Sequence, residues 1–284
     1  MLNLSNRNEP YFIAEIGINH NGDLEIAKKL IDAAHACDWE CVKFQKRNPD
    51  ISVPEAQKNI IKDTPWGKMA YIKYKHKIEF KKKEYSFIDE YCKLKPIDWS
   101  ASVWDIDSLN FMSHYDLPFI KIPSAMITNK ELIIESARTN IQLIISTGMS
   151  TIEEIDSAVE LVIKHGRNPV ILHSVSSYPS FQEELNLNTI LFLKERYSGC
   201  IIGYSGHEMS LEPSVVAVAL GAKVIERHVT LSHSMWGTDQ STSLEVHAMD
   251  MLKKRTVGMN EMMGIKDKVL SKSELKKRKM LRGY

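Results

Sequence analysis

Two histidines stand where short β-branched runs end: His207 closes Gly203-Tyr-Ser-Gly-His207, and His228 closes Glu226-Arg-His228. A single histidine in such a place is more often a hydrogen-bonded packing residue than a metal ligand. Two converging imidazoles with no other obvious protein ligand would leave several coordination positions open, which is typical of a catalytic metal site. We therefore expect a divalent metal here, although the spacing does not distinguish zinc, iron, cobalt and manganese.

Two lysines and three serines suggest an anion site. Lys43 and Lys121 fall inside runs that otherwise resemble buried strands, and an ammonium group is costly to bury without an anionic partner. Ser124, Ser146 and Ser205 each stand at the exit of a predicted strand. For any one serine a helix cap is the simpler interpretation, but their convergence with two ammonium groups would suit a phosphate with an adjacent carboxylate.

The elements that position these residues alternate along the whole chain. Apolar, β-branched runs predict strands at 11–17, 40–45, 98–103, 118–123, 142–147, 169–174, 200–205 and 223–230. Amphipathic stretches between them predict helices near 23–37, 82–94, 105–114, 129–139, 151–165, 186–197, 210–220 and 245–264. This repeat of βα units in 284 residues predicts an α/β fold, a single-domain (β/α)8 TIM barrel, which typically needs about 250 residues.

The barrel also predicts which side chains meet. Active sites of such barrels lie at the C-terminal ends of the strands, where these polar residues gather. Because the side chains of a strand alternate between its two faces, Lys43 and Gln45 share the inner face. The same parity directs two further pairs inward, Ser205 with His207 and Glu226 with His228. Arg227 should then point outward toward the helices.

Two segments lie outside the repeat. The connection 47–81 is unusually long, and loops of that length are usually lids or binding loops, with a solvated excursion as the alternative. After the eighth predicted helix, the segment 265–284 is a basic tail. We interpret this tail as solvated, with binding to a partner as the alternative.

The composition excludes several classes of protein. Lys and Arg total 37 against 36 acidic residues, so no global charge attracts nucleic acid or a membrane. The first residues lack the pattern of a signal peptide and the chain has no apolar run long enough for a transmembrane helix, which predicts a cytoplasmic protein. The four cysteines, Cys37, Cys41, Cys92 and Cys200, have no metal-type spacing and are expected to be free thiols.

Several segments carry a resemblance to a known family, in the same order, between about residues 10 and 264. They are Glu15-Ile-Gly-Ile-Asn-His-Asn-Gly22, Val42-Lys-Phe-Gln-Lys-Arg47, Lys121-Ile-Pro-Ser124, Ile145-Ser-Thr-Gly-Met149, Gly203-Tyr-Ser-Gly-His207, Glu226-Arg-His228 and Met235-Trp-Gly-Thr-Asp-Gln240. Together they resemble the catalytic barrel of the N-acetylneuraminate (sialic acid) synthase family. The resemblance implies a barrel over 1–264 and a tail over 265–284, without the antifreeze-like domain that many members carry.

The resemblance also implies a role for each site residue. Those that would hold phosphoenolpyruvate are Lys43, Lys121, Ser124, Ser146 and Ser205. Those that would contact the acceptor sugar are Gln45, Tyr178 and Asp239, with Ser176 as a further substrate-binding position. His207 and His228 would bind the metal, manganese in the first place, with magnesium or cobalt as alternatives. Glu15 matches a buried carboxylate of the family that sets the polarity of the site. Met126 and Ser176 depart from the Glu and Asn of some members.

The implied reaction is a transferase reaction, in which C3 of phosphoenolpyruvate attacks the aldehyde of an N-acyl amino sugar. A nine-carbon 2-keto acid and phosphate are the products, and the enzyme is expected to be a cytoplasmic homodimer. The acceptor stays open among N-acetylmannosamine, its 6-phosphate, mannose and a diamino sugar. Two other functions are a Schiff-base aldolase using Lys43 or Lys121, and a barrel that binds sugar phosphates without turning them over.

Overall fold

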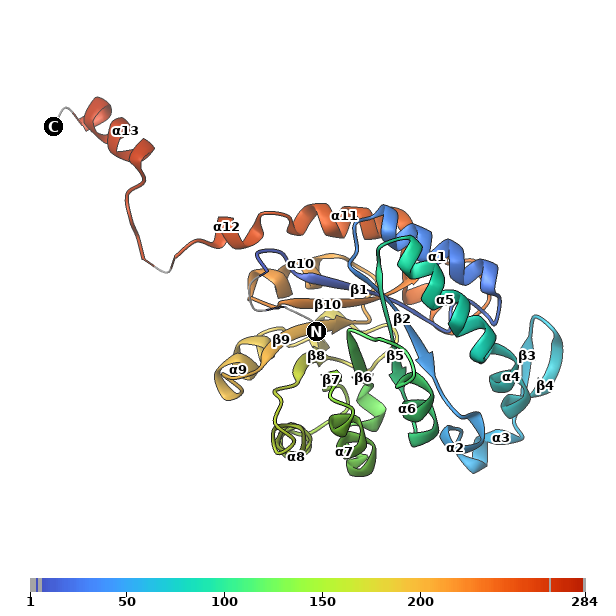
Figure 1. Ribbon diagram of the computed structural model, residues 1–284. Helices are drawn as coiled ribbons and strands as arrows, with labels where there is room; N and C mark the ends of the chain where they lie inside the picture. Colours follow the sequence, from blue (N-terminus) through green and yellow to red (C-terminus); the bar gives the residue numbers. More distant parts are fainter. Residues whose placement is uncertain (1–3, 5–6, 266, 283–284) are drawn as a thin grey trace.

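The computed structural model describes residue 4, residues 7–265 and residues 267–282, and a ring of parallel strands forms its centre (Figure 1). In order around the ring, the strands are β1 (Tyr11–Gly17), β2 (Cys41–Lys46), β5 (Asp98–Val103), β6 (Phe119–Ile122), β7 (Gln142–Ser146), β8 (Val170–Ser174), β9 (Ile201–Gly206) and β10 (Val224–Thr230). β1 pairs with β10, which closes the ring. The predicted (β/α)8 barrel is therefore confirmed.

A helix follows each strand of the ring and covers its outside. These helices are α1 (Leu24–Ala36), α5 (Lys82–Leu94), α6 (Ile106–Met112), α7 (Lys130–Arg138), α8 (Ile152–Ile163), α9 (Thr189–Arg196), α10 (Glu212–Ala219) and α11 (Val246–Thr256). Side chains cap several of the helix starts: Asp23 at α1, Asp105 at α6 and Asn129 at α7, while Thr151 and Glu154 form a capping box at α8. The predicted helix 245–264 is wrong in one respect. It breaks into α11 and α12 (Met259–Met263) because Gly258 adopts a φ of 70°, outside the range of a right-handed helix.

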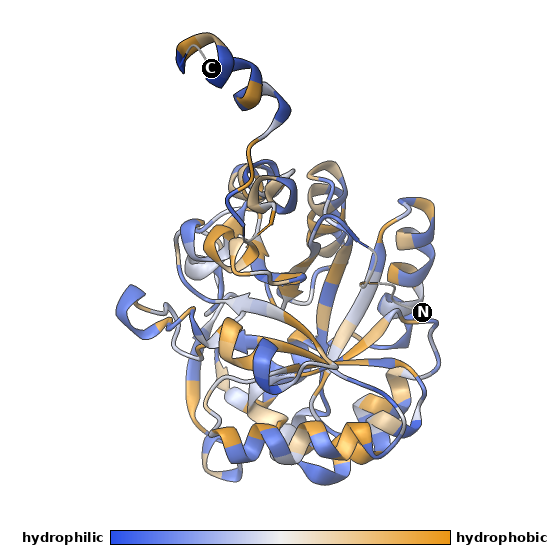
Figure 2. Ribbon diagram, turned by 90° about the vertical axis from the view of Figure 1, so that its left-hand side faces the viewer, coloured by the Kyte–Doolittle hydropathy of each residue, from blue (hydrophilic) through white to orange (hydrophobic). Residues whose placement is uncertain are grey.

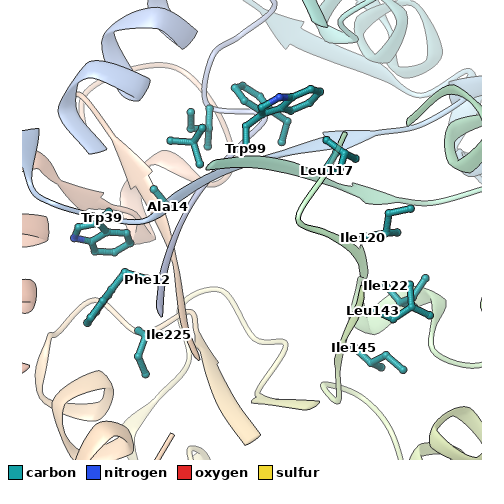
Figure 3. Close-up of a cluster of buried hydrophobic side chains, with 14 of the residues drawn as sticks. Phe12, Ala14, Trp39, Trp99, Leu117, Ile120, Ile122, Leu143, Ile145 and Ile225 are labelled. Carbon is teal, nitrogen blue, oxygen red and sulfur yellow. The ribbon is translucent and has the colours of Figure 1, made fainter. Parts of the chain in front are cut away.

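The apolar core has two layers. Side chains on the outer faces of the strands, such as Phe12, Ile122 and Ile225, point away from the ring and pack under the helices (Figure 3). A smaller inner cluster, which includes Tyr11, Phe119 and Leu172, fills the bottom of the ring. A strand that is buried on both faces has a nearly continuous apolar sequence. The ribbon coloured by hydropathy accordingly shows apolar stretches along the barrel strands (Figure 2).

The inner faces of the strands change character along their length. An apolar residue near the start is followed two positions later by a polar one: Ile13 and Glu15, Cys41 and Lys43, Phe119 and Lys121, Ile144 and Ser146, Leu172 and Ser174, Val224 and Glu226. The apolar members close the lower half of the barrel. The polar members therefore meet at the C-terminal ends of the strands.

The long connection between β2 and α5 is folded rather than extended. It contains α2 (Pro49–Ser52), α3 (Glu55–Lys58), an antiparallel hairpin of β3 (Ile61–Thr64) and β4 (Gly67–Ala70), and α4 (Tyr71–Ile78). Figure 1 shows this excursion beside the end of β2. Tyr74 and Ile78 of α4 are buried against Ile18, so the helix is anchored on the loop after β1.

Two features complete the fold. The short strand β11 (Leu244–Glu245) pairs with the end of β10 after a loop at the barrel mouth. The last helix, α13 (Lys272–Arg282), stands off from the barrel in Figures 1 and 2 and its side chains are exposed. Within the described part of the chain, no helix is both long enough and apolar enough to cross a membrane.

Candidate active site

A cavity opens at the C-terminal ends of the barrel strands. The predicted site residues that line it are Glu15, Lys43, Gln45, Lys121, Ser124, Ser146, Ser176, Tyr178, Ser205, His207 and His228. All three inward pairs that strand parity predicted line this cavity: Lys43 with Gln45, Ser205 with His207, and Glu226 with His228. Arg227 points the other way, where it pairs with Glu208 at 2.9 Å and donates to the Ser214 hydroxyl on α10. The predicted parity is therefore confirmed on β2, β9 and β10.

Two carboxylates neutralise the two buried lysines. The Lys43 ammonium lies 2.5 Å from Glu15 and donates to the Ser102 hydroxyl at 2.8 Å. The Lys121 ammonium donates to both oxygens of Glu226, each at 2.8 Å. From the sequence we predicted that both lysines need an anionic partner, and we expected a substrate to be that partner. The chain itself supplies these partners, so the four side chains sum to no net charge.

The pKa values of this cluster follow from its burial and its ion pairs. Burial opposes the charge on Lys43, but the carboxylates of Glu15 and Glu226 outweigh burial and raise the pKa of Lys43. Burial also opposes the charge on Glu226, yet the ammonium groups of Lys121 and Lys43 lower the pKa of Glu226 to about 2. For Glu15, burial dominates and raises the pKa, an effect that Lys43 partly offsets. Lys43 and Glu226 are therefore held charged.

The two predicted metal ligands lie side by side above this cluster, with ring centroids 5.7 Å apart. His207 Nδ1 lies 2.7 Å from the carbonyl oxygen of Val175, which can only accept, so Nδ1 carries the proton. His207 Nε2 is then the acceptor and faces the Tyr178 hydroxyl at 2.9 Å. Burial and the neighbouring His228 lower the pKa of His207 to about 4, which keeps the ring neutral near pH 7.

The donor set fits a metal ion that keeps open positions. His228 Nδ1 is buried, and among the described residues it has no hydrogen-bond partner. His207 has its second nitrogen tied to the backbone, an arrangement that commonly orients a metal-binding imidazole. Within residues 4, 7–265 and 267–282, no group of three His, Cys, Asp or Glu side chains is arranged to hold a metal. His207 and His228 would therefore leave most of the coordination sphere to other ligands.

The wall formed by the ends of β6, β7 and β8 is made of hydroxyls. Ser146 Oγ and Ser174 Oγ are buried and lack a hydrogen-bond partner in the part of the chain that the structure describes. The Ser124 hydroxyl accepts from the backbone N–H of Gly148 at 3.1 Å. A Cβ at Gly148 would clash with Ser176 Oγ, so any side chain there would force the Ser176 hydroxyl to move. Unsatisfied buried hydroxyls beside two ammonium groups suit an oxygen-rich anion.

Comparison with known proteins identifies the family of this chain. The family model of the NeuB family matches residues 30–268. The chain belongs to the NeuB family. It is similar to the N-acetylneuraminate-9-phosphate synthase of Drosophila melanogaster, with 39% identity over 245 residues, or 85% of this chain and 66% of that protein. It is also 35% identical to the N,N'-diacetyllegionaminic acid synthase of Campylobacter jejuni over 269 residues, or 93% of this chain and 80% of that one.

Solved structures agree with this assignment. The N-acetylneuraminic acid (sialic acid) synthetase of Leptospira borgpetersenii superposes with a TM-score of 0.87 at 30% identity, covering 99% of this chain and 96% of that one. A truncated 3-deoxy-D-arabino-heptulosonate 7-phosphate synthase of Thermotoga maritima shares the barrel with a TM-score of 0.68 but only 14% identity, which is a likeness of fold alone. The chain spans 66% of the length of its Drosophila and human relatives, slightly less than two thirds.

One predicted residue of this NeuB family site lies beside the cavity rather than in its lining. Asp239 Oδ2 is 4.0 Å from His228 Nδ1, and its other oxygen accepts from the Thr238 hydroxyl. The loop that carries Asp239 is held by the segment after β1: Asn21 donates to the Trp236 carbonyl at 2.7 Å, and Gln240 donates to that of Asn19 at 3.1 Å. The motif Ile18-Asn-His-Asn-Gly22 therefore supports the loop that carries Asp239.

Sequence reasoning directed Glu226 into the cavity but gave it no role, and it missed three further side chains of the lining, Ser102, Trp104 and Ser174. Strand parity could have found two of these, because Ser102 and Ser174 stand two positions beyond inward residues of their strands. The third, Trp104, follows β5 in a loop, where no periodicity predicts the direction of a side chain.

Proposed function

We propose that this chain condenses phosphoenolpyruvate with an N-acyl amino-sugar aldehyde to give a nine-carbon 2-keto acid of the sialic acid type and phosphate. One observation carries the proposal: the buried hydroxyls of Ser146 and Ser174 have no partner among the described residues and stand in the same cavity as Lys43 and Lys121. The names of its relatives, synthases of N-acetylneuraminate 9-phosphate and of legionaminic acid, support the same reaction.

Lys43 and Lys121 would bind phosphoenolpyruvate through the ammonium hydrogens that are not used in their ion pairs. An ammonium has three donors. Lys43 uses one on Glu15 and one on Ser102, and Lys121 uses two on Glu226, so each keeps one for the substrate. The carboxylates orient the ammonium groups before the substrate arrives, which lowers the cost of ordering them during the reaction.

The hydroxyls would complete the anion site. Ser124, Ser146 and Ser205 come from three strand ends, so they can surround a phosphate group from different sides. Ser205 donates to Glu226 at 3.2 Å and can accept from or donate to a ligand with its remaining capacity. This arrangement holds the phosphoenolpyruvate near the floor of the cavity, with its reacting carbon toward the histidines.

We assign His207 and His228 as the ligands of a divalent metal, with manganese preferred and magnesium or cobalt as alternatives. The bound ion would supply Lewis-acid polarisation of the acceptor's carbonyl group. The chain's own residues would orient the sugar: Gln45, whose amide nitrogen donates to Glu15 at 2.8 Å, and Tyr178, whose hydroxyl lies 2.9 Å from His207 Nε2. Asp239 and Ser176 would contact hydroxyls of the same sugar.

Phosphate release from phosphoenolpyruvate tests the proposal. The wild-type chain with Mn2+ should release phosphate with at least one acceptor among N-acetylmannosamine, its 6-phosphate, mannose and a diacetamido sugar. His207→Ala and His228→Ala should each abolish release, and should also lower bound Mn2+ in a metal-content measurement. Full turnover in excess chelator, with metal content shown to be nil, would overturn the metal assignment. Absence of release with every acceptor would overturn the reaction.

A Schiff-base aldolase is the second candidate, and one observation favours it. Burial lowers the pKa of Lys121, and an amine nucleophile must lose its proton. Against this, the Lys121 ammonium donates to both oxygens of Glu226, which stabilises the protonated form. Borohydride treatment in the presence of pyruvate separates the two reactions, because only the aldolase should form a stable covalent adduct.

We further propose a cytoplasmic homodimer. The four cysteines are free thiols, as expected in a reducing compartment. Light scattering on the purified chain would test the dimer, which rests on the family resemblance.

A further inference from the structure

The excursion after β2 contains a buried lysine whose charge has no counterion. Lys75 of α4 is 7% exposed, whereas Lys73 and Lys77 of the same helix are exposed. In the described part of the chain, the Lys75 ammonium has neither a hydrogen bond nor a carboxylate oxygen within 4.0 Å. What faces it are the rings of Tyr71 and Tyr74, with centroids at 5.1 and 5.6 Å.

The nearest carboxylates are used elsewhere. Glu79 accepts from the Lys46 ammonium at 2.8 Å and from the backbone N–H of Arg47 at 3.0 Å. Asp239 accepts from a neighbouring hydroxyl and faces His228. Burial, together with the like charge of Arg47, lowers the pKa of Lys75 to about 8, and Asp239 and Glu79 only partly oppose this.

Arg47 is a second cation, close enough to Lys75 for its like charge to lower the pKa of Lys75. It follows β2 directly, and its guanidinium carbon lies 4.3 Å from the ring centroid of Trp104, which lines the active-site cavity. Its Nε is buried and has no hydrogen-bond partner among the described residues. A planar guanidinium fixed on an aromatic face with a free N–H is suited to bind a phosphate.

Helix α4, which carries Lys75, lies beside the part of the site that we assign to the acceptor sugar. The Tyr74 ring contacts the Trp236 ring edge to face at 5.2 Å, and Trp236 belongs to the loop that carries Asp239. The floor of the cavity is neutral because Glu15 and Glu226 balance Lys43 and Lys121. The uncompensated positive charge therefore lies beside the mouth of the barrel, next to the residues assigned to the sugar.

We propose that Arg47 and Lys75 form a subsite for a phosphate monoester at the end of the acceptor sugar remote from its aldehyde. The proposal rests on the proposed function, because the aldehyde end must face His207 and His228 for the other end to reach α4. A position that served packing alone would favour an apolar side chain of similar length, since burying an unpaired ammonium is unfavourable. A dianionic group between the two cations removes that disadvantage only when the phosphorylated substrate is bound.

The chain should therefore prefer a phosphorylated acceptor. We would compare kcat/KM for N-acetylmannosamine 6-phosphate and N-acetylmannosamine at saturating phosphoenolpyruvate and Mn2+. The variants are Lys75→Met and Arg47→Met, with Lys73→Met as the matched control from the exposed face of α4. Each test variant should lower kcat/KM for the phosphorylated acceptor by about ten- to a hundredfold, the usual effect of one charge-assisted contact, and Lys73→Met should leave it unchanged. Values for the unphosphorylated acceptor should stay within about threefold in every variant.

A direct binding measurement with the phosphorylated sugar tests the subsite without turnover. Isothermal titration of the 6-phosphate into the wild-type chain should give a signal that the double variant Arg47→Met, Lys75→Met loses, while both proteins keep the same circular dichroism spectrum. Equal use of both acceptors by the wild type, or equal losses with both acceptors in the variants, would overturn the subsite and leave the condensation intact. Absence of phosphate release with every acceptor would overturn the condensation, and the titration would then decide the subsite separately.

Discussion

Lys121 and Glu226 meet across the barrel at the floor of the cavity, with the ammonium nitrogen of one 2.8 Å from both carboxylate oxygens of the other. They come from β6 and β10, which lie on opposite sides of the ring. The pair is nearly inaccessible to solvent, so each partner is costly to leave alone.

Breaking this pair should destabilise the fold. Glu226→Gln leaves the Lys121 ammonium buried without its main counterion, and the free energy of unfolding should fall by about 3–5 kcal/mol. Urea unfolding measures this. The double variant Lys121→Met, Glu226→Leu should recover much of the loss, because no charge then remains unpaired between these positions. Strictly additive losses would contradict a direct coupling of the two residues.

Removing either lysine should impair the use of phosphoenolpyruvate. Lys43→Met and Lys121→Met should each raise the KM for phosphoenolpyruvate about ten- to a hundredfold, since one charge-assisted contact to the anion is lost. The KM for the sugar should change far less. Steady-state kinetics with each substrate varied in turn measures both KM values. A rise confined to the KM for the sugar would show that the two subsites are interchanged.

Asp239 should act on the acceptor alone. Asp239→Asn keeps the size of the side chain but removes the charge that we assign to sugar hydroxyls, so kcat/KM for the acceptor should fall about tenfold or more. The KM for phosphoenolpyruvate, the bound Mn2+ and the melting temperature should stay close to wild type. An unchanged acceptor kcat/KM in a folded variant would remove Asp239 from the site.

Gly148 should tolerate no side chain next to the serine wall. In Gly148→Ala the new Cβ would clash with Ser176 Oγ and lie 2.9 Å from Ser124 Oγ, so both hydroxyls must shift, and Ser124 is one of those that we assign to phosphoenolpyruvate. The KM for phosphoenolpyruvate should rise about tenfold or more, as expected for the loss of at least one hydrogen bond to a charged group. Adding Ser176→Ala should partly restore it, because the closest clash is then removed; no restoration would show that the effect arises elsewhere.

Lys75 should make stability rise with pH above 8. Its pKa is about 8 in the folded chain and its usual value is 10.5, so between these pH values the unfolded chain binds the extra proton and the folded chain does not. Stability should therefore increase through this window, by on the order of 3 kcal/mol relative to Lys75→Met. Urea unfolding of both proteins at pH 7 to 10.5 measures the difference. A difference that does not change with pH would show that Lys75 is not buried as a cation.

The sequence by itself determined the barrel and the direction of most site residues. Alternation of βα units predicted every strand of the ring, with β1 and β5 at the predicted bounds. The two-residue period then directed Lys43, Gln45, His207 and His228 into one cavity. These features are local, because the period of a strand is set by its own backbone and a closed barrel brings all C-terminal strand ends to one rim.

Only the tertiary structure decided how the charges are paired. Lys121 and Glu226 are 105 residues apart in the chain, and no local pattern relates them. The burial of Lys75 likewise depends on how α4 docks on the loops after β1 and β10, whereas its sequence neighbours Lys73 and Lys77 are exposed. Electrostatic energies depend on separation in space and on access of water, and both quantities exist only once the chain has closed into the barrel.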